Sequence, residues 1–285
     1  MTRNRALAAL VLVPLLAVAL ASCGDDDERL SKPEFTKELN ALCKERDKKT
    51  EPLLDEQNFF NMKIGQKVWP KAKTVIDDYI DGVSDLEPPE DAEELIDSYL
   101  DDADAVAANV DDVIDAANDE DQKVYSQQLN SLFNKFGSID KEIGAYGAGD
   151  CFDEDEQFPE SEEPAAGAAV VEIGATEYAF EIPSGIKAGK TAFKLVNKGE
   201  ELHLLGYGRL KEGATFEQLK QAISSGEEDP GLLEEEGLTG IASPDGSITA
   251  NTELSAGTYV AYCFLPAPDG EEHLKKGMLA SFAVS

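Results

Sequence analysis

Residues 256–278 read AGTYVAYCFLPAPDGEEHLKKGM and place a cysteine, a histidine and a methionine in order within one short stretch. The GTYVAYC part has the aromatic and β-branched side chains of a strand, in which Tyr259 and Cys263 share one face because strands have a period of two. The LPAPDG part predicts a turn. A strand followed by a loop that returns to it is expected to bring Cys263, His273 and Met278 around one point.

These residue types are scarce in the rest of the chain, which has 285 residues but only 2 histidines, 4 cysteines and 3 methionines. The second histidine, His203, follows a turn predicted at 197–199, and we expect it within a strand over 201–210. Imidazole, thiolate and thioether groups are side chains that suit copper. The two histidines and Cys263 therefore make a copper site a candidate for this part of the chain.

The segments around this stretch predict a β-sandwich. Short runs rich in β-branched and aromatic residues alternate with turn signals from residue 168 onward. The predicted strands cover residues 170–183, 191–199, 201–210, 247–254, 257–265 and 278–285. Residues 211–238 interrupt the pattern, since Thr215 and Gln218 have the spacing of a helix cap. We expect a helical insertion between strands there.

Three motifs in this region carry a family resemblance. GTYVAYC at 257–263 is similar to the cupredoxin strand that ends in the ligand cysteine, and NKGEELH at 197–203 resembles the turn that leads to the upstream ligand histidine. EHLKKGM at 272–278 resembles the segment with the downstream histidine and the axial methionine. Residues 168–285 therefore resemble a cupredoxin, a Greek-key β-sandwich that holds one type 1 copper ion. The implied metal ligands are His203, Cys263, His273 and Met278.

Two features depart from the small members of that family. The nine residues between Cys263 and His273 make a longer loop, which leaves the solvent exposure and the tuning of the metal open. The insertion at 211–238 is absent from the small cupredoxins and suggests a cap or a partner surface. The resemblance also implies that His273 is the exit for an electron.

Residues 31–152 have a helical pattern of apolar residues, which predicts an all-α bundle. Apolar residues recur at helical spacing in four runs with short connections, as in an antiparallel helical bundle. The runs begin at Phe35, Trp69, Leu95 and Tyr125. Acidic groups such as 101–104 and 111–115 are expected on solvated helix faces. Weak cation capture is the alternative, although neither group has the spacing of a calcium loop.

The first 22 residues predict export. A charged start, a short apolar run and small residues at the exit are typical of a secretory signal. Leu20-Ala21-Ser22-Cys23 resembles the lipobox of bacterial lipoproteins, in which the cysteine becomes the first residue and carries the lipid. Residues 23–30 would then be a tether, and the protein would be anchored by lipid at the extracytoplasmic face of a membrane. An ordinary secretory signal is the alternative.

Export places the other cysteines where disulfides persist. Cys43 lies in the first predicted helix and Cys151 follows the last one, so a bond between them would close the bundle on itself. Cys263 would then be the unpaired thiol. Residues 153–167 are acidic, contain proline and lack any periodicity, so they predict a linker between bundle and sandwich.

Taken together, these features predict a multi-domain chain with an N-terminal all-α helical bundle and a C-terminal all-β Greek-key sandwich that carries a helical insertion. The 58 acidic against 25 basic residues argue against a nucleic-acid partner. The resemblance implies one-electron transfer with a redox partner and no enzyme activity, because four protein ligands leave no open position on the metal. Copper capture or delivery with a donor or acceptor protein, and a copper-free interaction module, remain open.

Overall fold

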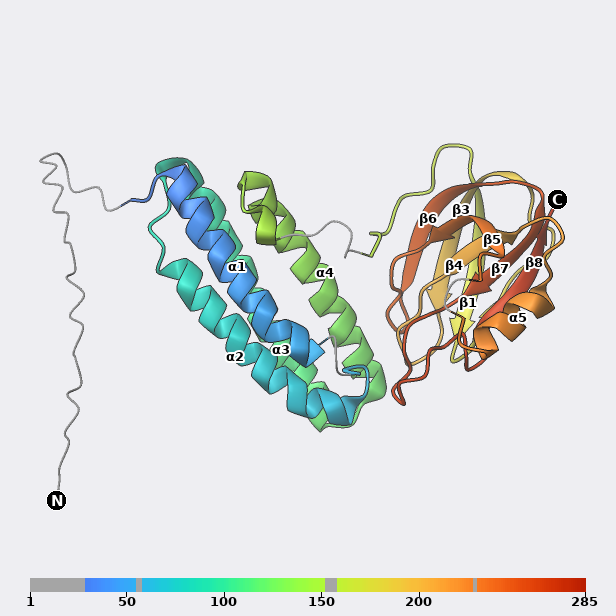
Figure 1. Cartoon of the computed structure of the whole chain (residues 1–285), viewed down its shortest axis with the longest axis horizontal. Helices are drawn as coiled ribbons and strands as arrows, with labels where there is room; N and C mark the ends of the chain where they lie inside the picture. The colour runs from blue at the N-terminus through green and yellow to red at the C-terminus, as the bar shows by residue number, and fades with distance from the viewer. Residues whose placement is uncertain (1–28, 55–57, 152–157, 228–229) are drawn as a thin grey trace, which may run out of the picture.

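The computed structural model describes residues 29–54, 58–151, 158–227 and 230–285. The predicted signal segment, the predicted lipidation site at Cys23 and most of the predicted tether lie outside these residues. Within the described residues, no helix combines the length and the apolar composition needed to cross a membrane. Figure 1 shows a helical N-terminal region, drawn in blue to green, and a β-sheet region, drawn in yellow to red.

Four long helices build the N-terminal region that the structure describes, which confirms the predicted helical character. They are α1 (Lys32–Leu54), α2 (Met62–Ser84), α3 (Glu93–Asn118) and α4 (Gln122–Tyr146), with 3-10 turns η1 (Glu90–Ala92) and η2 (Gly149–Cys151). Each long helix packs against the next along the chain. Their apolar stripes meet in one core, whose largest buried side chains include Phe35, Trp69, Tyr99 and Tyr125.

The second helix begins about two turns before the apolar run that was predicted to start at Trp69. Its first residue is Met62, and Asn61 caps it: the Asn61 side chain accepts hydrogen bonds from the backbone amides of Lys63 and Ile64. These bonds satisfy two of the amides that a helix start leaves free. The cap therefore sets the start of α2, and the apolar period alone does not reveal it.

A disulfide closes the helical region. Cys43 in α1 and Cys151 in η2 are bonded, with a Cα–Cα distance of 5.1 Å and a sequence separation of 108 residues, as predicted. Cross-linking a loop of this length reduces the entropy of the unfolded chain, which stabilises the folded state by about 4 to 5 kcal/mol in the loop-entropy model.

A buried ion pair joins the first and last helices. Arg46 donates from Nη1 to both carboxylate oxygens of Asp140, at 3.2 and 3.1 Å, and the two side chains are 10% and 13% exposed. The Tyr99 hydroxyl donates to the same carboxylate at 3.5 Å and contacts the Tyr79 hydroxyl at 2.7 Å. Burial raises the pKa of Asp140, and Arg46 opposes that shift. Each charge is tolerated in the interior because the other one compensates it.

Two four-stranded sheets form the C-terminal region within the described residues, in the orders β2-β1-β3-β6 and β5-β4-β7-β8. Their strands are β1 (Ala169–Thr176), β2 (Ala179–Glu181), β3 (Gly189–Asn197), β4 (Gly206–Leu210), β5 (Leu233–Leu238), β6 (Ser247–Leu254), β7 (Gly257–Tyr262) and β8 (Leu279–Val284). The β1–β3 pair is parallel and the other pairs are antiparallel. The Phe193 ring of β3 meets Tyr207 of β4 and Phe282 of β8 edge-on, so the sheets pack face to face.

The insertion after β4 contains a helix and also a strand. Helix α5 (Phe216–Ser224) begins at Thr215 with the predicted capping box, in which Thr215 and Gln218 satisfy each other's backbone amides. Strand β5 then returns along the edge of β4. The prediction of a purely helical insertion is therefore wrong for β5, because its sequence LEEEGL lacks the alternation that marks a strand.

Removing one charge of the buried pair is expected to destabilise the helical region. Asp140→Ala removes the buried partner of the Arg46 guanidinium and leaves it only the half-exposed Asp47, which lowers the free energy of unfolding by about 3 to 5 kcal/mol. Asp47→Ala is the matched control, since Asp47 contacts the same guanidinium but is 51% exposed. Its effect should stay below about 1 kcal/mol. Chemical denaturation followed by circular dichroism measures the free energy of unfolding of both variants. Equal decreases in the two variants would contradict a stabilising role for the buried Arg46–Asp140 pair.

Candidate metal centre

Cys263 is placed by the strand that precedes it. It follows β7, which lies between β4 and β8, and its backbone amide donates to the carbonyl of Met278 at 3.2 Å. Tyr259 and Cys263 are both fully buried, as the predicted alternation requires. The backbone amides of Leu204 and Leu265 donate to the cysteine sulfur. The strand register therefore fixes the sulfur inside the sandwich.

The loop after Cys263 folds back on itself and returns His273 to the end of β7. The His273 amide donates to the Leu265 carbonyl at 2.9 Å, and Pro266 and Glu272 form a β-bridge. Gly270 takes a positive φ of 90° at the tip, which a glycine adopts without strain. The Met278 amide then donates to the His273 carbonyl at 2.9 Å. The loop's own hydrogen bonds hold its shape.

His203 comes from a segment far along the chain from Cys263 and His273, and it is fully buried. Strand β4 begins only at Gly206, so the prediction that His203 lies within this strand is wrong. The pairing of β4 with β5 and β7 begins only at Gly206, whereas His203 forms an isolated antiparallel bridge with Ala242. The Asn197 side chain donates to the carbonyl of Ala242 at 2.9 Å and accepts from the amide of Gly199, which fixes the predicted turn.

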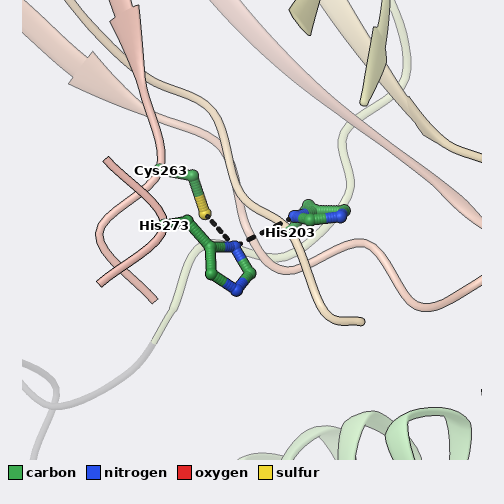
Figure 2. Close-up of side chains that lie close together, drawn as sticks. All are labelled: His203, Cys263 and His273. Atoms are coloured by element: carbon green, nitrogen blue, oxygen red, sulfur yellow. Dashed lines mark hydrogen bonds between the residues drawn. The ribbon is translucent and has the colours of Figure 1, made fainter. Parts of the chain in front are cut away.

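The three side chains converge. Ligand atoms of His203, Cys263 and His273 all lie within 4.8 Å of one another. The His203 and His273 Nδ1 atoms are 3.2 Å apart, and the Cys263 sulfur is 3.5 Å from His273 Nδ1. Figure 2 shows His273 between the other two, with its Nδ1 toward both. The structure thus brings together three of the four predicted ligands.

The fourth predicted ligand, Met278, is fully buried and lies five residues after His273 in the chain. Its backbone joins the site on both sides, donating to His273 and accepting from Cys263. These bonds place residue 278 beside the two ligands. A role for its thioether on the metal stays a prediction.

Burial sets the electrostatics of the cluster. It lowers the pKa of His203 to about 3, with a smaller contribution from His273 and partial opposition from Glu177. The His203 imidazole is therefore neutral at pH 7, as a metal ligand must be. Burial also raises the pKa of Cys263 to about 12, and the two backbone amides that donate to its sulfur oppose the shift. Without a metal the thiol keeps its proton.

Three residues around the site were not singled out from the sequence. Glu201 Oε2 lies 2.9 Å from His273 Nε2, and Glu177 Oε1 lies 4.0 Å from His203 Nε2. The Tyr178 ring packs edge-on against the His273 ring at 5.4 Å between centroids, so that His273 is only 1% exposed. These contacts join segments far apart in the chain, and residue spacing carries no signal of them.

Several solved structures resemble the β-sheet part of this chain. Reduced auracyanin from the photosynthetic bacterium Roseiflexus castenholzii is 22% identical, over 42% of this chain and 99% of that one, with a TM-score of 0.29. Auracyanin A of Chloroflexus aurantiacus, a "blue" copper protein, is 20% identical over 42% and 100%, with a TM-score of 0.28. An amicyanin variant in its reduced state is 18% identical over 45% and 97%, with a TM-score of 0.26.

The sequence matches no protein-family model and no curated protein. At the identities and TM-scores above, the solved structures do not transfer a function to this chain. A functional assignment therefore rests on the chemistry of the His203, Cys263 and His273 side chains.

The thiol of Cys263 is expected to be unreactive in the folded, metal-free protein. Its side chain is 0% exposed and its pKa is raised to about 12, so almost no thiolate meets an alkylating reagent at pH 8. Peptide mapping after alkylation should find Cys263 modified slowly in buffer and rapidly in denaturant. Cys43 and Cys151 are internal controls that react only after reduction. Equal rates at Cys263 in both conditions would contradict the buried site.

Proposed function

We propose that this protein binds one copper ion in its C-terminal sandwich and transfers single electrons. The observation that carries the proposal is the convergence of two imidazole Nδ1 atoms and one cysteine sulfur within 4.8 Å. They belong to the only 2 histidines of the chain and to the free cysteine of the described residues. Side chains that only fill a core would not be expected to bring both histidines and the free cysteine to one point.

The donor set fits copper by its chemistry. Two imidazoles and a thiolate, with a weak thioether nearby, suit a blue copper site, whereas structural zinc sites in proteins are commonly closed by four nitrogen or sulfur ligands. His203, Cys263 and His273 would hold the ion, and Met278 would tune it. Bound copper would supply a reversible one-electron couple.

The surrounding residues would hold the ligands in a fixed geometry and keep water away from the metal. The buried sheet around Cys263 and the bonded loop around His273 hold the ligands in place, so that little rearranges between oxidation states. The described sheets exclude water, since all four residues are at most 1% exposed. With four protein donors no position is left for a substrate, so we propose an electron carrier and no enzyme.

We also propose a fold family and a cellular location for this protein. We assign residues 168–285 to the cupredoxins, with their Greek-key sandwich and a single type 1 copper, because the motifs at 197–203, 257–263 and 272–278 support it. The export signal and the lipobox-like motif support a lipid anchor at Cys23 on the extracytoplasmic face of a bacterial membrane. A redox protein in that compartment would be the partner.

Addition of Cu(II) to the metal-free protein tests the site directly. We expect an intense visible band from thiolate-to-copper charge transfer, at one ion per chain. His203→Ala and Cys263→Ser should each abolish it, because each removes a ligand. Met278→Leu should keep the band and shift the reduction potential, since an axial ligand tunes the potential without being needed for the band. A colourless wild type would rule the copper site out.

Voltammetry and metal transfer separate electron transfer from copper delivery. We expect a reversible one-electron wave and retention of copper in the presence of a competing chelator, because buried ligands release an ion slowly. Refolded His203→Ala serves as the control with an incomplete site. Rapid handover of the ion to an apo acceptor, with sluggish electron exchange, would favour delivery instead.

A further inference from the structure

Two acidic side chains approach the outer ring nitrogens of the candidate ligands, and they differ in distance and exposure. Glu201 Oε2 is 2.9 Å from His273 Nε2, and the Glu201 side chain is 13% exposed. Glu177 Oε1 is 4.0 Å from His203 Nε2, and the Glu177 side chain is 38% exposed. Only Glu201 is both within hydrogen-bonding distance and shielded from water.

The Glu201 contact is close but not aligned. His273 Nε2 and Glu201 Oε2 are buried, and neither atom has a hydrogen-bond partner of acceptable geometry. Leaving a buried polar group unpaired costs about 1 to 3 kcal/mol. The 2.9 Å separation of His273 Nε2 and Glu201 Oε2 lies within hydrogen-bonding distance, and each atom is the nearest candidate to satisfy the other.

Glu201 is held on two sides. The Tyr178 hydroxyl donates to Glu201 Oε1 at 3.2 Å, and the Asn197 side chain donates to the Glu201 carbonyl at 2.7 Å. Tyr178 occupies the turn between β1 and β2 with a φ of 64°, a left-handed conformation that costs a non-glycine residue about 1 kcal/mol or more. A strained turn residue that contacts both Glu201 and His273 fixes their relative position.

The turn before Tyr178 adds to this arrangement. The Glu177 carboxylate accepts hydrogen bonds from the backbone amides of Glu200 and Glu201. Lys276 lies over the Tyr178 ring at 5.0 Å from its centroid and pairs with Asp269. The β1–β2 turn therefore fastens the segment before His203 to the loop that carries His273.

We propose that Glu201 is a positioning residue that holds the Nε2 proton of His273 and lowers the reduction potential of copper bound at this site. The inference rests on the proposed function. A carboxylate that accepts from a ligand imidazole fixes its tautomer, directs Nδ1 to the metal and makes the ligand more basic. Its negative charge stabilises Cu(II) more than Cu(I), because the more highly charged ion interacts more strongly with it.

Isosteric removal of each acid tests the potential. Glu201→Gln should raise the midpoint potential, with the ratio of Cu(II) to Cu(I) affinity falling about tenfold, which equals 59 mV for a one-electron couple. Glu177→Gln is the matched control and should shift the potential much less, because its carboxylate is more distant and more exposed. Both variants should keep the visible band, since no ligand is lost.

The outcomes are distinguishable. Visible bands in all three proteins, with the Glu201→Gln and Glu177→Gln potentials equal, would overturn the role of Glu201 and leave the copper site standing. A wild type without the band would overturn both.

Nitrogen-15 NMR of the imidazoles tests the contact without copper, because the chain has only 2 histidines to assign. In the metal-free protein His273 should carry its proton on Nε2, and His203 should then donate from Nδ1 across the 3.2 Å contact. Glu201→Gln should shift the His273 Nε2 resonance. Tyr178→Phe, which keeps the ring and loses the hydroxyl, should shift it less. An unprotonated His273 Nε2 in the wild type would overturn the proposal even if the variant failed to fold.

Discussion

The register of β7 between β4 and β8 is the constraint on which the candidate site depends. Tyr262 is paired with Gly206 on one side and with Leu279 on the other, so Cys263 leaves the sheet at a fixed point. A slip by one residue would turn the sulfur to the other face of the sheet, because side chains alternate along a strand. The buried cluster around Cys263 exists only in this one register.

Local patterns in the sequence predict the elements, and long-range contacts supply the rest. The alternation in GTYVAYC places Cys263 inside, and helical spacing reveals the apolar faces that the bundle buries. The late start of β4 could not be predicted, since it depends on where its pairing with the distant strands β5 and β7 begins. The same holds for Glu201, whose carboxylate meets a histidine far along the chain. Residue spacing describes neighbours along one element, whereas a site joins several elements.

The acidity of the whole chain and the acidity at the site are separate matters. The formal net charge is −33, yet water and salt screen exposed charges over about 8 Å at physiological ionic strength. A carboxylate that is buried against an imidazole is screened much less. The Glu201 carboxylate, 2.9 Å from His273 and 13% exposed, is therefore less screened from the clustered side chains than Glu177, which is 4.0 Å from His203 and 38% exposed.

The bond between Cys43 and Cys151 also determines how the chain carries mechanical load. When the two ends of the protein are pulled apart, tension enters α1, crosses the sulfur atoms and continues toward the sandwich. Helices α2, α3 and α4 lie in the bypassed segment and bear none of it. A pull that would otherwise unravel the bundle can extend the chain by only a small part of its length, so the distance between the start of α1 and the sandwich stays bounded while the bond is intact.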